Sequence, residues 1–515
     1  MKGVWSFGLA AVLLSWSETV TAASLELGAP FRDHAVLQRG MKLPVWGKAA
    51  PGDTVTVSFA GQVKSAVADA AGAWRVTLDP LTASKEPRDL VVETCADGVA
   101  GVRALPNQTI LHDILVGEVW LCAGQSNMAI PFWDESPRGR EKLGVQFGQI
   151  CNRPDIRVAV LRNDWAVERQ TKEGVSWQAM TSARLKSGFF SAVGAWFGIF
   201  VHDALDVPVG LLGAYVGATG IETWTPQGED GERIVPADKW TKEMVRRRIT
   251  GAQQQPGAYF NGKIAPIVPY ALRGMVWYQG EHDAHGGPAE AAGYTARLHA
   301  LYDGYAREFE NPNLGFRFTQ LAPWGSDESV YLQEAQAKFA AEEKRAAMCV
   351  IADRGNLKDI HPNDKLTVGL RLALLALKYD YGREDVAADS PVLRDWTVED
   401  GKFVMTFDHV TKFCLLDPDW CYHVDDAKTD TLGFEVAGAD GKWHPARIGN
   451  LRKLAGRGIT WTEYRGQIDG GPTLTVWSDA VKEPKRLRYL HSRPWFARVI
   501  NEAGLPLGPF HIDRE

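Results

Sequence analysis

The sequence lacks most of the features that would point to nucleic acid, a membrane or a cysteine-bound metal. Its 515 residues carry a formal net charge of -6 and no run rich in Lys and Arg, which argues against nucleic-acid binding. The six cysteines include no CxxC pair of the kind found in zinc sites. Beyond the N-terminus, no segment offers the ~20 apolar residues that a membrane-spanning helix needs. The composition is that of an ordinary globular protein, and its length predicts two or three domains.

The first residues have the pattern of an export signal. Lys2 precedes an apolar stretch over residues 4–16, and small residues suited to cleavage follow at 20–23. We therefore expect a signal peptide over residues 1–23 and a soluble, exported mature protein, periplasmic or extracellular. The alternative is an uncleaved membrane anchor. In an exported chain, Cys414 and Cys421 could close a small disulfide loop.

The pattern of apolar residues changes twice along the chain. Residues 24–110 show short alternating runs broken by turns, which predict an N-terminal β-domain. The β pattern returns over residues 389–515, and this C-terminal β-rich region could pack against the first one. Both regions are expected to be β-sandwich-like and to flank a central domain over residues 111–388, with an insertion near residues 222–260.

The central domain alternates strands and helices. Apolar runs predict buried parallel strands at 119–123, 156–161, 209–216, 275–278 and 348–352. Helical patterns lie between them, at 192–205, 291–309 and 332–343. Such alternation predicts an α/β fold whose parallel sheet is covered by helices on both faces. In such sheets ligands bind beyond the carboxyl ends of the strands.

A candidate nucleophile follows the first of these strands. Ser126 lies in the run GQSNM at 124–128, and far downstream Asp359 and His361 precede an amphipathic helix. A serine hydroxyl becomes a good nucleophile only when a base such as histidine removes its proton, so these residues predict a serine hydrolase. The alternative for the pentapeptide is that Ser126 only caps a helix.

Several ordered blocks of this chain resemble those of the sialate O-acetylesterase family, which belongs to the SGNH (GDSL-like) hydrolases. In addition to GQSNM, they are FRDHAVLQR at 31–39, GATGIETW at 217–224, NGKIAP at 261–266, WYQGE at 277–281, DIHP at 359–362 and EAGLP at 502–506. The resemblance covers nearly the whole mature chain. It implies a three-layer αβα hydrolase domain and removal of acetyl groups from sugars, without a metal or organic cofactor.

The resemblance also implies roles for single residues. Ser126 is the nucleophile and His361 the general base, and the oxyanion hole combines the N–H groups of Ser126 and Gly217 with the side-chain amide of Gln279. The wider superfamily places its acid three residues before the histidine, where this chain has Lys358. We therefore expect Asp359 to orient His361. Asp353 and a backbone carbonyl are the alternatives.

The substrate is less well defined by the sequence. Trp224, Gln125 and Glu281 are the candidate substrate-binding residues. For Glu281 we favour bracing of the loop that carries Gln279 over contact with substrate, and an ordinary surface carboxylate is the alternative. Trp240 and Tyr259 could also stack on sugar rings. We expect an acetylated oligo- or polysaccharide, such as hemicellulosic xyloglucan, with O-acetylated sialic acid close behind. The alternatives are an SGNH lipase or thioesterase for longer acyl chains, and a non-catalytic carbohydrate-binding protein.

A metal site at His282 and His285 is disfavoured, because no further ligand cluster supports it.

Overall fold

The computed structural model describes residues 25–95, 107–132, 150–162, 164–227, 251–324, 329–356, 359–416, 432–453, 464–492 and 496–514. The expected signal peptide, Lys358, Cys421 and Trp240 lie outside these ranges. Cys414 is a free thiol. Within the described ranges, no helix is long and apolar enough to cross a membrane.

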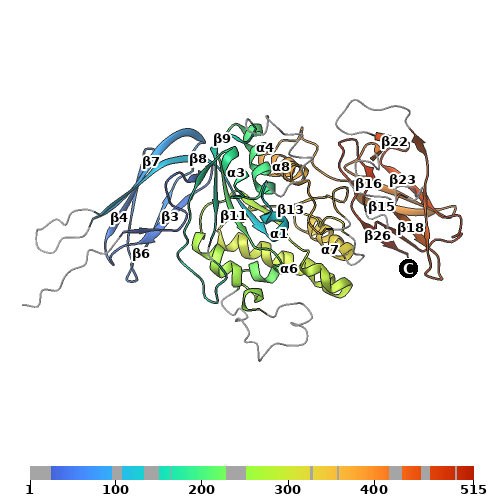
Figure 1. The fold of residues 1–515 in the computed structure, drawn as a ribbon, viewed down its shortest axis with the longest axis horizontal. Coiled ribbons are helices and arrows are strands. Elements are labelled where there is room, and N and C mark those ends of the chain that lie inside the picture. Colours follow the sequence, from blue (N-terminus) through green and yellow to red (C-terminus); the bar gives the residue numbers. More distant parts are fainter. Residues whose placement is uncertain are drawn as a thin grey trace, which may run out of the picture.

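The central domain is built on a mixed sheet whose strands run in the order β10-β9-β11-β8-β12-β13-β14 (Figure 1). All neighbours pair in parallel except β10, which runs antiparallel to β9. This confirms the expected α/β class and the five predicted strands. The strands are β8 (Gln108–Gly124), β9 (Arg153–Val160), β10 (Gln178–Met180), β11 (Val209–Tyr215), β12 (Gly274–Tyr278), β13 (Gly315–Thr319) and β14 (Ala346–Cys349).

Helices pack against both faces of this sheet. Neighbouring residues of β8 point to opposite faces and therefore contribute to two different cores. Trp120 and Cys122 share a core with α4 (Ala192–Leu205) and α8 (Lys365–Tyr381). Leu121 and Ala123 face the core that contains α6 (Gly287–Glu308), and α7 (Ser329–Glu342) also packs there. The three helices predicted from the sequence thus correspond to α4, α6 and α7.

Short helices lie between these elements along the chain. They are α1 (Ser126–Ala129), α3 (Ser182–Lys186), η3 (Ile221–Trp224), η5 (Ala252–Gln254), η6 (Phe260–Ile264), η7 (Ala265–Ile267) and η8 (Asp283–Gly286).

The N-terminal β-region shares a strand with the central domain. In its first half, β8 pairs antiparallel with β7, and from Glu118 onward it pairs with β11 in the central sheet. The border expected at residue 110 thus lies inside one continuous strand. The region's other strands are β1 (Glu26–Leu27), β2 (Val36–Gln38), β3 (Leu43–Lys48), β4 (Thr54–Phe59), β5 (Gln62–Val67), β6 (Ala73–Leu78) and β7 (Ser84–Cys95).

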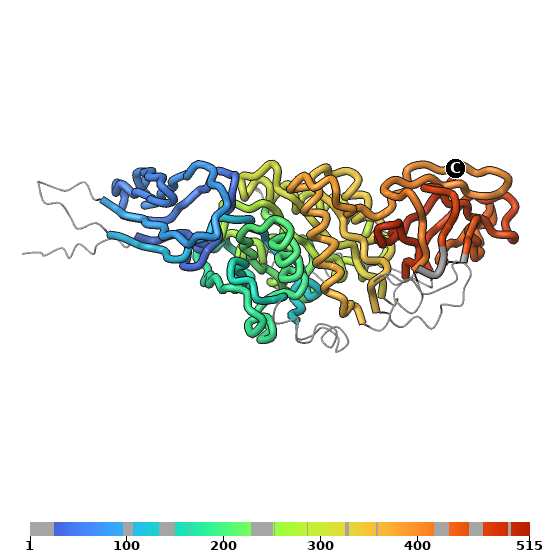
Figure 2. The backbone as a smooth tube through the Cα atoms, turned by 90° about the horizontal axis from the view of Figure 1, so that it is seen from above, coloured from blue at the N-terminus to red at the C-terminus, as the bar shows by residue number. Residues whose placement is uncertain are grey.

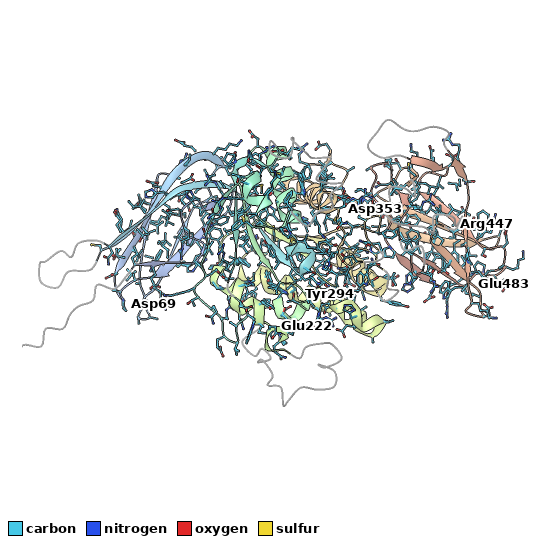
Figure 3. All side chains as sticks on the ribbon, viewed as in Figure 1. Asp69, Glu222, Tyr294, Asp353, Arg447 and Glu483 are labelled. Atoms are coloured by element: carbon cyan, nitrogen blue, oxygen red, sulfur yellow. The ribbon has the colours of Figure 1, made fainter. Side chains whose placement is uncertain are left out.

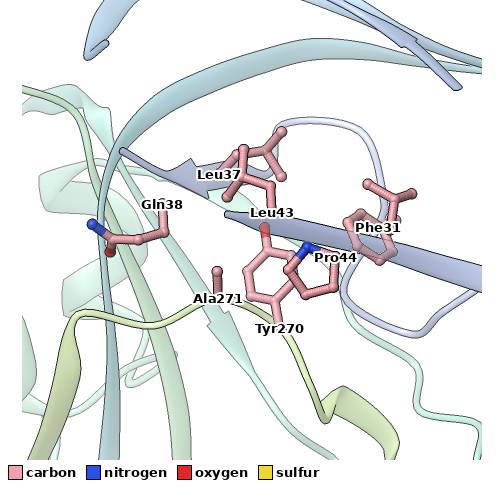
Figure 4. A pocket seen from close by; sticks show the side chains of 8 residues that line it. Phe31, Leu37, Gln38, Leu43, Pro44, Tyr270 and Ala271 are labelled. Atoms are coloured by element: carbon pink, nitrogen blue, oxygen red, sulfur yellow. The ribbon is translucent and has the colours of Figure 1, made fainter. Parts of the chain in front are cut away.

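A small void lies where this region meets the central domain (Figure 4). Its volume of about 10 Å³ leaves room for about one water molecule, so it cannot hold a sugar. Its lining is mostly apolar and consists of Phe31, Leu37, Gln38, Leu43, Pro44, Val45, Tyr270 and Ala271.

The C-terminal region is β-rich, as expected, and its described residues form three four-stranded sheets. In β16, Phe403, Met405 and Phe407 are buried and alternate with less buried residues. The strands are β15 (Val392–Glu399), β16 (Lys402–Asp408), β17 (Phe413–Leu416), β18 (Phe434–Ala437), β19 (Trp443–Pro445), β20 (Arg447–Ile448), β21 (Leu451–Lys453), β22 (Tyr464–Ile468), β23 (Thr473–Trp477), β24 (Arg486–Tyr489), β25 (Val499–Ile500) and β26 (Phe510–Asp513).

The two β-regions do not pack against each other as the sequence suggested. They lie at opposite ends of the molecule in two perpendicular views (Figures 1 and 2). The C-terminal core instead includes Val350 and Ala352, which follow β14. Ala497 also donates a backbone hydrogen bond to the carbonyl of Ala352, over 2.8 Å. The C-terminal region therefore packs on the central domain.

Candidate active site

The candidate nucleophile lies in a tight turn at the carboxyl end of β8. Gly124 has φ +143°, and a Cβ at this position would lie 2.1 Å from the carbonyl oxygen of Tyr278, so only glycine fits. Gln125 donates its N–H to the same carbonyl over 3.0 Å. The turn then enters α1, which begins at Ser126. Close packing of β8 against β12 thus fixes where the serine leaves the sheet.

Ser126 and His361 meet, although 235 positions separate them in the chain. Ser126 Oγ lies 2.9 Å from His361 Nε2. The residue in the N-cap position of α1 is Gln125, not Ser126. The hydroxyl therefore faces an imidazole rather than capping a helix.

Asp359 lies on the opposite side of the histidine ring. Its Oδ1 is 3.0 Å from His361 Nδ1 and also accepts the backbone N–H of His361 at 3.0 Å. A neutral ring with its hydrogen on Nδ1 donates to this carboxylate and leaves Nε2 to accept the hydroxyl hydrogen of Ser126. The short spacing between Asp359 and His361 is therefore compatible with an orienting contact.

Asp353, the alternative orienting acid, pairs with two arginines instead of with His361. It is buried where the central domain meets the C-terminal region (Figure 3). Arg371 donates two hydrogen bonds to it, at 2.6 and 2.7 Å, and Arg354 lies 3.1 Å away. Burial acts to raise the pKa of Asp353, but the charges of Arg354 and Arg371 outweigh it, and the net pKa is lowered. Asp353 thus belongs to a buried ion pair.

Two backbone amides beside Ser126 are available for an oxyanion. A Cβ built on Gly217 would lie 3.5 Å from the Cβ of Ser126, so this glycine faces the nucleophile closely. Within the described part of the chain, neither the N–H of Ser126 nor that of Gly217 donates to a protein acceptor. Both expected backbone donors can therefore serve the site.

The third expected donor, Gln279, is not available in this structure. The side chain is fully buried, and its amide nitrogen donates to the carbonyl of Thr219 at 2.9 Å and to Asp283 at 2.5 Å. Its amide oxygen accepts from the hydroxyl of Tyr294 at 2.8 Å. Because both amide hydrogens are used, the structure places Gln279 as a brace between loops and corrects the expectation of an oxyanion donor.

Asn127 connects the serine turn to the histidine loop. Its side-chain nitrogen donates to the carbonyl of Ile360 at 3.1 Å and to the carboxylate of Glu281. Its oxygen accepts from Lys365 Nζ at 2.6 Å. Asn127 and Lys365 were not singled out from the sequence as functional. The only signal was their position, next to Ser126 and at the start of the helix that follows His361.

Glu281 and Gln125 also brace the site. Glu281 is buried, and this burial raises its pKa, although the hydrogen bond from Asn127 and the charge of Lys365 partly oppose the shift. Gln125 is buried as well, and its side-chain oxygen accepts the N–H of His282 at 3.2 Å and that of Gly280 at 3.4 Å. Both side chains hold neighbouring loops, so neither forms an open platform for a sugar.

Trp224 is likewise not a sugar-stacking surface. It is fully buried, its indole N–H donates to the hydroxyl of Thr219 at 2.9 Å, and its ring stacks on Tyr259 with centroids 5.1 Å apart. Tyr259 is buried too. The expected stacking role of both aromatic residues is therefore wrong for this structure.

An acidic cluster near the site is already paired with a cation. The cluster consists of the carboxylates of Glu222, Asp283 and Glu290, which lie close together. The cation is the guanidinium of Arg297, which lies 3.3 Å from Glu222 and 2.8 Å from Glu290. Glu222 lies in the central domain in Figure 3. His282 and His285 belong to neither of the two groups of three potential metal ligands in the described ranges.

Comparison with known proteins agrees with this geometry. The family model described as "Carbohydrate esterase, sialic acid-specific acetylesterase" matches residues 116–377, which carry Ser126 and His361. The chain belongs to this family. It is a carbohydrate esterase, as the resemblance implied.

Relatives and a solved structure extend the likeness over most of the chain. It is 26% identical to human sialate O-acetylesterase over 420 residues, which cover 75% of this chain and 76% of the human protein. It is 25% identical to the mouse sialate O-acetylesterase over 471 residues, covering 80% and 84%. The crystal structure of a carbohydrate acetylesterase from Xanthomonas citri has a TM-score of 0.76 and 29% identity, covering 95% of this chain and 99% of that one.

Proposed function

We propose that this carbohydrate esterase is a serine enzyme that removes O-acetyl groups from glycans through an acetyl-enzyme. The observation that carries this proposal is the contact of 2.9 Å between Ser126 Oγ and His361 Nε2, with Asp359 on the other ring nitrogen. The helices on both faces of the parallel sheet support a three-layer SGNH-type hydrolase domain over residues 111–388, between β-regions over 24–110 and 389–515.

The reaction proceeds in two halves. His361 Nε2 takes the hydroxyl proton as Ser126 Oγ attacks the acetyl carbonyl, and the N–H groups of Ser126 and Gly217 stabilise the oxyanion. Protonated His361, stabilised by Asp359, then gives its proton to the departing sugar oxygen and leaves an acetyl ester on Ser126. Water activated by His361 attacks this ester and releases acetate and the free serine.

The proposed substrate is an acetylated oligo- or polysaccharide such as a xyloglucan fragment, with O-acetylated sialic acid as the alternative. The Xanthomonas citri structure is that of a carbohydrate acetylesterase, and the mammalian relatives are sialate O-acetylesterases. A sialic acid carboxylate is usually recognised by an arginine. Arg297 already pairs with Glu222 and Glu290 and is therefore not free to bind such a carboxylate, which favours the neutral glycan.

Acetate release tests the substrate class. Acetylated xyloglucan and xylan oligosaccharides are compared with an O-acetylated sialoside, and nitrophenyl esters from acetyl to octanoyl measure the chain-length preference. We expect the neutral glycans and the acetyl ester to be the best substrates. Turnover of the sialoside alone would contradict the glycan proposal, and a preference for octanoyl would contradict acetylesterase activity.

Replacement of the nucleophile tests the mechanism. Ser126→Ala should lower kcat by roughly 10⁴-fold or more and leave folding intact, because Ser126 Oγ forms the covalent bond. The circular dichroism spectrum and the melting temperature serve as controls for folding. Turnover equal to that of the unchanged protein would contradict the assignment.

We also propose that residues 1–23 direct export and are removed. N-terminal sequencing of the secreted protein tests this, and the expected mature chain begins at or close to Ser24.

A further inference from the structure

Three potential metal ligands converge where α7 of the central domain meets the C-terminal β-region. Glu334 lies on α7, His491 follows β24, and His511 lies in β26. Glu334 Oε1 is 2.8 Å from His491 Nε2 and 2.7 Å from His511 Nδ1. Ligand atoms of all three residues lie within 4.8 Å of one another. Figure 1 shows α7 beside β26.

The surroundings hold two of the ligands firmly and leave one side open. The side chains of His491 and Glu334 are only 6% and 17% exposed, whereas that of His511 is 51% exposed. Tyr331, one turn before Glu334 on α7, packs edge-on against the ring of His491 with centroids 5.9 Å apart. A bound ion would therefore have three protein ligands and a solvent-facing position for water.

We propose that Glu334, His491 and His511 form a binding site for a zinc-class divalent cation. Two imidazole nitrogens and one carboxylate oxygen are a donor set that zinc binds, commonly with water as the fourth ligand. Calcium and magnesium prefer oxygen ligands, so they fit this site poorly. In this structure His491 Nε2 and His511 Nδ1 each donate a hydrogen to Glu334 Oε1. On binding, each of these hydrogens is released to water or is replaced by one on the other nitrogen of the same ring, so that each ring keeps one hydrogen and offers the ion a lone pair.

The two distances to the carboxylate oxygen need little change to suit tetrahedral zinc, and the two ring nitrogens lie within 4.8 Å of each other. Zinc bonds of about 2.0–2.2 Å place neighbouring ligand atoms roughly 3.3 Å apart. Each ring nitrogen must therefore move away from the carboxylate oxygen by about half an ångström. The half-exposed His511 can make its own part of this movement, and a shift of the Glu334 side chain would lengthen the distance to the buried His491.

The bound ion would join the two parts of the molecule. Glu334 belongs to the central domain and the histidines to the C-terminal region, so the ion would add a coordinate link to the apolar contact between them. The acidic cluster of Glu222, Asp283 and Glu290 makes a useful contrast, because Arg297 already pairs with its carboxylates. In the Glu334 cluster the partners of the carboxylate are histidines, which are themselves zinc ligands.

Zinc titration of the full chain, produced without a histidine tag, tests the proposal. We expect isothermal titration calorimetry to give one Zn²⁺ per chain and a rise in melting temperature at saturating zinc. Co²⁺ should give the visible absorption of a tetrahedral site. His511→Ala and Glu334→Gln should each weaken binding at least about 10-fold and remove most of the thermal shift.

A matched control uses a histidine–carboxylate pair that belongs to neither group of three potential ligands found among the described residues. His299 Nε2 lies 3.1 Å from Glu342 Oε2, so His299→Ala should leave zinc binding unchanged. The absence of one-to-one zinc binding in the unchanged protein would overturn the proposal, as would undiminished binding by both His511→Ala and Glu334→Gln. The Ser126 mechanism does not depend on this result, because the readout is metal binding rather than ester hydrolysis.

Discussion

Two aspartates, Asp359 and Asp353, are candidates for the residue that orients the ring of His361. Asp359 contacts the ring at 3.0 Å but its side chain is 53% exposed, whereas Asp353 is buried against Arg371. Asp359→Asn should lower kcat by about 100-fold, which is less than the roughly 10⁴-fold loss in a protease with a buried aspartate, because water screens the exposed carboxylate. Asp353→Asn should leave kcat of the folded protein nearly unchanged. A large loss of kcat in Asp353→Asn, with none in Asp359→Asn, would reverse the assignment.

Asp353 should instead matter for stability and its dependence on pH. Removing its charge leaves Arg371 buried without its anion, so Asp353→Asn should lower the free energy of unfolding by about 3 kcal/mol at neutral pH. Because the folded-state pKa lies below the ordinary value of 3.8, this contribution is full above that pH and is lost as the pH falls through the lowered pKa. Urea unfolding of both proteins at neutral and acidic pH measures the difference. An equal difference at pH 7 and pH 2 would contradict this account.

A substitution of Gln279 tests whether this residue braces the loops or donates a hydrogen bond to the oxyanion. Gln279→Met keeps the length of the side chain but removes its hydrogen bonds to Thr219, Asp283 and Tyr294, so the melting temperature should fall. The kcat of the folded variant should fall less than about tenfold, whereas loss of an oxyanion donor costs roughly 100- to 1,000-fold. Steady-state kinetics well below the melting temperature decide between them. Unchanged stability with a 100-fold lower kcat would restore Gln279 to the oxyanion hole.

Single-residue roles were only partly predictable from the sequence. The positions of Ser126 and His361 followed from a motif after a strand and from the family resemblance. The roles of Gln279 and Trp224 could not be predicted in this way. Gln279 donates to Thr219 and Asp283, and Trp224 donates to Thr219, and only folding brings these partners close. A sequence gives the residue types but not which hydrogen bonds they have already made.

At the scale of elements, one side chain connects α1 to the loop before α8. Asn127→Ala removes the hydrogen bonds to the carbonyl of Ile360 and to Lys365, so His361 should lose its fixed distance from Ser126. We expect kcat to fall roughly 100-fold with little change in KM, since small displacements of reacting groups are costly. The rate at which a fluorophosphonate labels Ser126 should fall in parallel. An unchanged labelling rate would show that this connection does not position the pair.

Elements with clear apolar patterns were predicted, whereas the buried strand β13 was missed. The strands and helices built from apolar runs match the structure closely. β13 was missed because Arg317 interrupts its apolar pattern. In the fold this arginine is buried and forms two hydrogen bonds with Asp380 on α8, at 2.7 and 2.9 Å. The sequence alone does not show that Arg317 has this partner, so it did not reveal the arginine as a buried residue of a strand.

At the scale of the molecule, a buried carboxylate joins the N-terminal region to the central sheet. Glu118 on β8 is fully buried, contacts Arg39, and accepts from Gln38 at 2.9 Å and Arg273 at 3.0 Å. Glu118→Gln should lower the free energy of unfolding by about 2 to 3 kcal/mol, because charged partners lose their anion. Glu310, which pairs with Arg75 at the surface, is the matched control, and Glu310→Gln should cost less than about 1 kcal/mol. Equal losses in urea unfolding would contradict this ranking.

The most direct test of the enzyme's mechanism is the mass of the protein caught during turnover. The enzyme is mixed with an acetyl ester, quenched in acid, digested, and its peptides are measured by mass spectrometry, with Ser126→Ala as the control. Acid quenching preserves an ester while stopping its hydrolysis by His361. We expect one acetyl group on the peptide that contains Ser126 and none on the variant. An acetyl group on another residue, or full turnover by Ser126→Ala, would contradict the account.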